Sequence, residues 1–81
     1  MNGNQSAAEW LHSVARKAIA ASLGQEPSEV IVRRATVAAG AKGKGTHRVR
    51  AWVRMAESSC EVSVNVTRDG SYSDFRVIEY L

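Results

Sequence analysis

A cluster of basic side chains in the middle of the chain is the feature best suited to binding chemistry. Between Val30 and Ala56 the sequence has no Asp or Glu but seven bases: Arg33, Arg34, Lys42, Lys44, Arg48, Arg50 and Arg54. The remaining residues include four bases and eight acids, so the formal net charge of +3 conceals two segments of opposite sign. A long segment of one sign favours an anionic partner, because Lys and Arg neutralise phosphates and carboxylates.

The spacing within this cluster places several of the bases on one face of a predicted strand. Arg48, Arg50, Trp52 and Arg54 occupy every second position, and alternate residues of a β-strand project to the same face. Single-stranded nucleic acid is bound by cations that contact phosphates and by flat rings that stack on bases. The Gly/Lys loop of residues 40–45 places Lys42 and Lys44 nearby, where they would add phosphate contacts that carry no sequence information.

The elements that position these residues start with a helix. Ser6 and Glu9 have the spacing of a capping box, in which each side chain accepts a backbone N–H at the start of a helix. Gly24 suits the left-handed conformation that ends a helix, and Pro27 cannot continue it. The predicted apolar face of this helix consists of Trp10, Leu11, Val14, Ala15, Ala18, Ala21 and Ser22.

Two turns predict a series of hairpins. Asp69-Gly70 matches a type I′ turn, which would pair Val66 with Ser73, Val64 with Phe75 and Val62 with Val77. A turn at Glu57-Ser58 would pair Met55 with Cys60, Val53 with Val62, Ala51 with Val64 and Val49 with Val66. Both registers put the apolar residues of the three strands on one face.

The fold class predicted from these elements is α+β. One N-terminal helix packs on a four-stranded antiparallel meander, in the order α-β-β-β-β. The first strand runs roughly from Val30 to Ala39, and the adjacent bases Arg33-Arg34 indicate a bulge or an edge position in it. Its place beside the second strand or on the far edge is open. We expect a disordered N-terminus over residues 1–5 and a single domain over residues 6–81.

The sheet face away from the helix is the predicted binding surface. The fourth strand would add Tyr72, Asp74, Arg76, Ile78 and Tyr80 to it. The predicted contacts to nucleic acid or another polyanion are Arg48, Arg50, Trp52, Arg54 and Arg76, assisted by Lys42 and Lys44. A second interpretation is purely structural: the Arg stems cover Trp52, while Glu61 and Asp74 neutralise Arg54 and Arg50.

A third interpretation is a protein interface. Aromatic residues and Arg are enriched at interface centres, which suggests a homodimer or another protein partner contacting Trp52, Tyr72, Ile78 and Tyr80. The Arg residues of two such faces would repel each other unless they were offset to meet acidic side chains.

Catalysis is not indicated by any motif. His12 and His47 have no carboxylate or nucleophile at a recognisable spacing, and Cys60 falls among core-facing positions, where burial raises a thiol pKa. The chain has no cluster of Cys and His with metal-ligand spacing, so we expect neither an enzyme nor a metal or cofactor site. An enzyme whose residues are scattered through the fold remains the third function class.

The cysteine content and the absence of long apolar segments bear on location. One cysteine cannot form an intramolecular disulfide, which is typical of a reducing compartment. No segment resembles a signal peptide or a membrane span. We therefore expect a cytoplasmic protein that does not interact with membranes.

Overall fold

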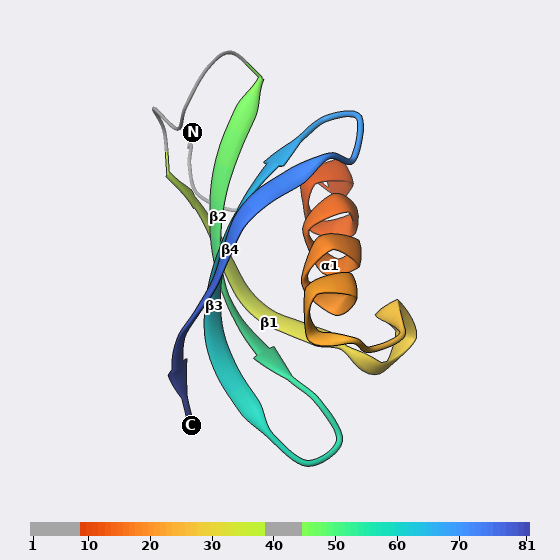
Figure 1. Cartoon of the computed structure of the whole chain (residues 1–81), viewed down its shortest axis with the longest axis vertical. Helices are drawn as coiled ribbons and strands as arrows, with labels where there is room; N and C mark the ends of the chain where they lie inside the picture. Colours follow the sequence, from red (N-terminus) through yellow and green to blue (C-terminus); the bar gives the residue numbers. More distant parts are fainter. Residues whose placement is uncertain (1–8, 39–44) are drawn as a thin grey trace.

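The computed structural model describes residues 9–38 and 45–81 and confirms the α+β architecture (Figure 1). The helix α1 (Glu9–Leu23) and a short 3-10 helix, η1 (Pro27–Glu29), precede four strands: β1 (Ile31–Ala38), β2 (Thr46–Arg54), β3 (Ser59–Thr67) and β4 (Tyr72–Tyr80). The predicted disordered segment, the Ser6 cap and the two lysines of the Gly/Lys loop lie outside the described residues. No helix within the described ranges is long and apolar enough to cross a bilayer.

The end of α1 has the predicted chemistry. Gly24 has a φ of 71°, in the left-handed region that a side chain disfavours. The Gln25 N–H donates to the Ala20 carbonyl at 2.8 Å, and the Gly24 N–H donates to the Ala21 carbonyl at 3.3 Å. These bonds pair carbonyls that the helix leaves open, and Pro27 then opens η1.

The hydrophobic core lies between α1 and one face of the sheet (Figure 1). The helix packs chiefly against β3 and buries Leu11, Ala15, Ala18, Ile19 and Ala20. The predicted helix face is therefore rotated from the observed one: Ile19 is fully buried, whereas Ala21 and Ser22 are exposed. The sheet contributes Val49, Ala51, Val53, Cys60, Val62, Val64 and Val66.

The first strand takes the edge beside β2, since the sheet order is β1-β2-β3-β4. The predicted irregularity is also present, because the β1–β2 register shifts between Val32 and Arg34. Arg33 is thus the extra residue of a bulge. The shift lets Val32 and Ala35 both pair with core residues of β2, and it brings Arg34 opposite Trp52.

The loop between β2 and β3 begins one residue earlier than predicted. The Met55 N–H donates to the Ser58 carbonyl at 2.8 Å, so Ala56 and Glu57 are the turn residues. Val53 consequently pairs with Cys60, where the prediction paired Met55 with Cys60. A shift of one turn position moves every cross-strand pair by two residues, which preserves the face of each side chain.

The hairpin between β3 and β4 does not use the predicted type I′ turn. Gly70 has a φ of 98°, but Asp69 is not among the described residues with positive φ, and a type I′ turn needs both. The Gly70 N–H donates to Thr67 at 3.0 Å, and the Thr67 N–H donates to Ser71 at 2.9 Å. The loop therefore has three residues, and Val66 pairs with Tyr72 instead of Ser73.

Two irregularities in β4 then move the register again. Asp74, with a φ of 54°, lies where the β3–β4 register shifts between Ser63 and Asn65, and the shift restores the predicted pairing of Val62 with Val77. A second shift, between Glu61 and Val62, makes Ile78 the extra residue. Each shift changes which side chains of β4 face away from the helix.

Truncating Ile19, a fully buried residue of α1, should test the assignment of the core. We expect Ile19→Ala to lower the free energy of unfolding by about 2 to 5 kcal/mol, because it removes a fully buried side chain and leaves a cavity. Lys17→Ala, at an exposed position of the same helix, should change it by less than about 0.5 kcal/mol. Urea denaturation followed by circular dichroism measures both, and equal losses would contradict this assignment of the core.

The hydrogen bonds of the β3–β4 turn should make the free energy of unfolding depend on pH. The Thr67 hydroxyl, and then the Ser71 N–H, donate to the Asp69 carboxylate and lower its pKa. A lowered pKa in the folded state stabilises the protein above the unfolded pKa of about 3.9, and this stabilisation is lost as pH falls through the folded pKa.

The difference in unfolding free energy between the wild type and Asp69→Asn should therefore shrink below about pH 4. Thermal unfolding from pH 2 to 7 measures this difference, and Glu57→Gln, in the exposed β2–β3 turn, is the control for a lost charge. A difference that stays constant with pH would exclude the role of the carboxylate.

Candidate functional site

The sheet face away from α1, called the open face below, is organised in rows of paired residues. One row crosses all four strands and contains Thr36, Arg50, Ser63 and Arg76. The next row contains Arg34, Trp52, Glu61 and Glu79. On either side lie the row of Ala38, Arg48, Asn65 and Ser73 and the shorter row of Ile31, Arg54 and Ser59. The register thus mixes cations, hydroxyl groups and one indole on a single surface.

The polar residues of β3 on this face are buried, although no described helix covers them. Glu61, Ser63 and Asn65 are 7%, 5% and 2% exposed. Their neighbours in β2 and β4 include long Arg side chains, whose apolar stems can cover short residues while the guanidinium groups stay in water. The open face therefore has a desolvated polar floor beneath a layer of cations.

Arg50 and Glu61 form an ion pair across the β2–β3 ladder. The Arg50 Nε donates to a Glu61 carboxylate oxygen, and the Arg50 side chain is 60% exposed whereas that of Glu61 is 9% exposed. Glu61 was predicted to neutralise Arg54. This is wrong because the earlier β2–β3 turn brings Glu61 opposite Trp52, within diagonal reach of Arg50.

Asn65 connects a cation to an acid. An Arg48 terminal nitrogen donates to the Asn65 side-chain oxygen at 3.4 Å, and the Asn65 amide donates to Asp74 at 3.1 Å. Asp74 was predicted to neutralise Arg50, but the carboxylate that pairs with Arg50 in the described part of the protein is that of Glu61. Arg34, Arg54 and Arg76 form no ion pair with any residue in the described ranges.

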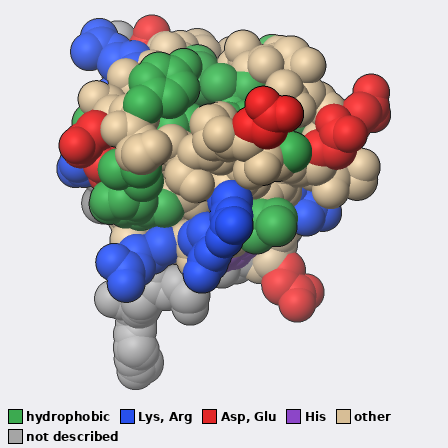
Figure 2. All heavy atoms as spheres, turned by 90° about the horizontal axis from the view of Figure 1, so that it is seen from below, with side chains coloured by type: hydrophobic (Ala, Val, Ile, Leu, Met, Phe, Trp, Pro, Cys, Tyr) green, Lys and Arg blue, Asp and Glu red, His purple; other side chains and the backbone are tan. Residues whose placement is uncertain are grey.

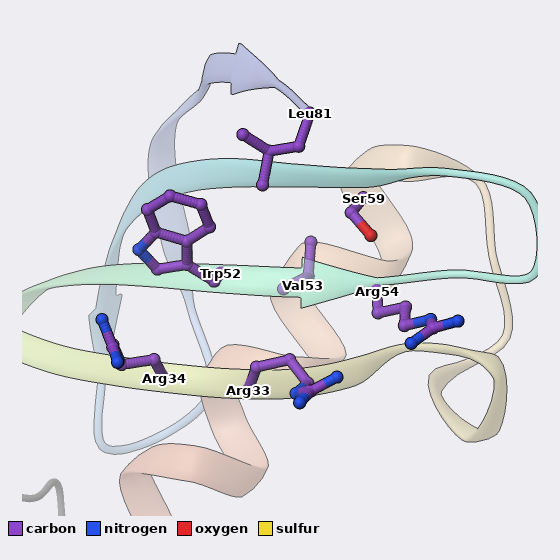
Figure 3. Close-up of a pocket in the computed structure, with 7 residues that line it drawn as sticks. All are labelled: Arg33, Arg34, Trp52, Val53, Arg54, Ser59 and Leu81. Atoms are coloured by element: carbon purple, nitrogen blue, oxygen red, sulfur yellow. The ribbon is translucent and has the colours of Figure 1, made fainter.

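The first of two hollows in this region has the Trp52 side chain in its lining and is called the indole hollow. It has a volume of about 400 Å³ and is lined by Arg33, Arg34, Trp52, Val53, Arg54, Ser59 and Leu81. Figure 3 shows the indole and the Leu81 side chain on one side of the hollow, with the two Arg side chains of β1 on the other. Trp52 is only partly buried, so a flat apolar group could stack on its ring.

The second hollow is lined by residues of the neighbouring rows and is called the serine hollow. It has a volume of about 440 Å³ and is lined by Thr36, Val37, Arg48, Arg50, Ser63, Arg76 and Ile78. The Ser63 hydroxyl has no hydrogen-bond partner in the described part of the protein, although it is buried. Three guanidinium groups and a buried hydroxyl thus line one concave site.

Figure 2 shows the end of the molecule that carries the β2–β3 loop and the C-terminus. Basic and apolar side chains lie next to one another in the lower half of this view. Exposed apolar residues near the end of β4 include Ile78, at 44%, and Leu81, at 58%. The basic surface is therefore not uniformly polar.

Of the predicted binding residues, the structure brings together Arg48, Arg50, Trp52, Arg54 and Arg76. Lys42 and Lys44 lie outside the described residues. Tyr72 and Tyr80 were predicted on the same face as Trp52, but they pair with the core residues Val66 and Cys60 and so belong to the helix side. The predicted interface set of Trp52, Tyr72, Ile78 and Tyr80 therefore does not share one face.

Sequence reasoning did not assign a role to two residues of the site. Arg34 lies on the open face because the bulge at Arg33 reverses the alternation of β1 side chains between the two faces of the sheet. The adjacent bases Arg33-Arg34 were the sequence feature that indicated this bulge. Ser63 gave no signal of its own, because its burial depends on side chains from the two neighbouring strands.

His47 contacts an aromatic ring, and Cys60 lies in the hydrophobic core. The rings of His47 and Trp10 meet edge to face with centroids 5.6 Å apart, and the Arg68 guanidinium lies 4.8 Å from the Trp10 ring centroid. Burial raises the pKa of the Cys60 thiol, as expected for a core cysteine. The described residues contain no group of three or more His, Cys, Asp and Glu that could hold a metal ion.

Comparison with protein-family models, curated proteins and solved structures found no match. The functional argument for this chain therefore depends on the open face itself.

Removing the cation of the Arg50–Glu61 pair should destabilise the sheet. We expect Arg50→Ala to cost about 1 to 3 kcal/mol, because it leaves the buried Glu61 carboxylate without its charged donor. Arg54→Ala, two residues along the same strand, removes an exposed cation without an ion pair and should cost less than about 0.5 kcal/mol. Urea titration of the two variants compares them, and equal stabilities would show that the pair contributes nothing.

Proposed function

We propose that this protein is a non-catalytic binding module that holds single-stranded nucleic acid on its open face. The observation that supports this most directly is the indole hollow, where Trp52 lies among Arg33, Arg34 and Arg54. A base can stack on the indole while the guanidinium groups neutralise the adjacent phosphates. The single buried cysteine and the reducing environment it suggests favour a cytoplasmic location for this activity.

The distribution of charge supports a polyanion more than a second copy of the chain. Five Arg side chains, Arg34, Arg48, Arg50, Arg54 and Arg76, occupy the open face with the acids Glu61, Asp74 and Glu79. Glu61 is already occupied by Arg50 and is buried, so it offers little to a partner. Two copies stacked face to face would bring their Arg rows together, which costs energy unless the faces are offset.

Homodimerisation is the alternative function, and one observation favours it. Ile78 and Leu81 are large apolar side chains that are about half exposed and line the two hollows. Apolar residues surrounded by Arg are common at protein interfaces. Sedimentation velocity at increasing protein concentration separates the alternatives, since a dimer gains mass with concentration and a monomeric nucleic-acid binder does not.

The test of the proposed function is fluorescence anisotropy with labelled single-stranded and duplex oligonucleotides at two or more salt concentrations. We expect saturable binding that favours the single strand. If Arg34, Arg54 and the neighbouring pair Arg48 and Arg76 each neutralise one phosphate, the slope of log K against log salt should be about −2, at roughly −0.7 per phosphate. No binding at low salt would overturn the proposal and leave homodimerisation as the leading function.

Replacing the indole tests the stacking contact. We expect Trp52→Ala to weaken binding to the single strand by about 1 to 3 kcal/mol, because the base loses its stacking partner, while the salt slope is unchanged. Tyr72→Ala is the matched control, since it removes an exposed aromatic ring on the helix side of the sheet. Equal affinities for the wild type and Trp52→Ala would remove stacking from the mechanism.

A further inference from the structure

The serine hollow contains a polar group that the fold itself leaves unused. The Ser63 hydroxyl is buried at the centre of β3, Ser63 is only 5% exposed, and the hydroxyl has no hydrogen-bond partner among the described residues. A buried hydroxyl without a partner costs stability, because it has given up its hydrogen bonds to water. Alanine at this position would avoid that cost, so the serine calls for an explanation.

The surroundings of this hydroxyl identify a partner of negative charge. Arg50 of β2 and Arg76 of β4 pair with Ser63 from the two sides, and Arg48 lines the same hollow. Arg76 has no ion pair with a described residue, and Arg50 keeps 60% of its side chain exposed although its Nε is bound to Glu61. The guanidinium groups only donate hydrogen bonds and the hydroxyl can also donate one, so an anionic acceptor can satisfy all of them at once.

The arrangement of the donors favours phosphate over carboxylate. Guanidinium groups from two strands lie on either side of Ser63, whose hydroxyl belongs to the buried strand between them. A tetrahedral phosphate can accept from several directions at once, whereas a carboxylate has two oxygens in one plane. The volume of about 440 Å³ exceeds a single phosphate and leaves room for an attached sugar.

We infer that the serine hollow binds one backbone phosphate of the bound nucleic acid. Ser63 donates a hydrogen bond to this phosphate, and Arg48 and Arg76 neutralise its charge. This inference rests on the proposed function and places one phosphate on the open face. The Trp52 row lies next to the Ser63 row, two residues along each of β2 and β3, so a base stacked on Trp52 belongs to a nucleotide close to this phosphate.

Ser63→Ala provides the test, with Ser73→Ala as the matched control on the same face. Ser73 is exposed, lies in the neighbouring row and does not line the hollow. Ser63→Ala should raise the melting temperature of the ligand-free protein and weaken binding to a labelled oligothymidylate about tenfold, because it removes a hydrogen bond to a charged group. Its salt slope should not change, since no charge is lost, whereas the double variant Arg48→Ala/Arg76→Ala, which removes both cations from this phosphate, should reduce the slope by about 0.7.

A probe without bases separates this inference from the proposed function. Inorganic phosphate, compared with sodium chloride at equal ionic strength, should shift the amide NMR signals around Ser63 and Arg76 in the wild type and in Ser73→Ala, whereas Ser63→Ala should need about ten times more phosphate for the same shifts. If oligothymidylate binding weakens in Trp52→Ala but is equal in the wild type and Ser63→Ala, the phosphate-binding site at Ser63 is overturned and the proposed function is retained. If inorganic phosphate shifts the amide NMR signals but no oligonucleotide binds, the phosphate-binding site is retained and the nucleic-acid function is overturned.

Discussion

The central strand β3 has to be buried on both of its faces, and the rest of the fold depends on that requirement. On one face Val62, Val64 and Val66 are fully buried in the core that α1 completes. On the other face the short polar residues Ser63 and Asn65 are almost as inaccessible, although no described helix packs there. The neighbouring strands must therefore supply long side chains to that face, and those side chains include arginines.

This arrangement makes the same arginines structural and available for binding. Arg50 shows both roles, since its Nε is bound to the buried Glu61 while most of its side chain remains in water. Arg48 is held through Asn65, which is itself linked to Asp74. Guanidinium groups fixed in this way lose less freedom on meeting a phosphate than mobile surface arginines would. The unpaired Ser63 hydroxyl is the one buried polar atom of the described side chains that this network leaves unsatisfied.

How much the sequence predicts depends on whether a feature is local. The end of α1 at Gly24, the four-stranded antiparallel sheet and the alternation of Val and Arg along β2 follow from short patterns, and the structure confirms them. The turns are less determined. Asp69-Gly70 fits a type I′ turn and a three-residue loop nearly equally well, and the choice changes the register of β4 by one residue. The irregularities at Asp74 and Ile78 then correct and change it again.

The sequence by itself determined that one face of the sheet is apolar and that the opposite face of β2 presents Arg and Trp, because side-chain alternation is a property of a single strand. Only the tertiary structure decided that Tyr72 and Tyr80 lie on the helix side and that Arg34 joins Trp52. It also decided that Glu61 neutralises Arg50 and that Ser63 is buried without a partner. These features depend on the pairing of residues from different strands, and one additional residue in a loop or bulge changes which side chains meet.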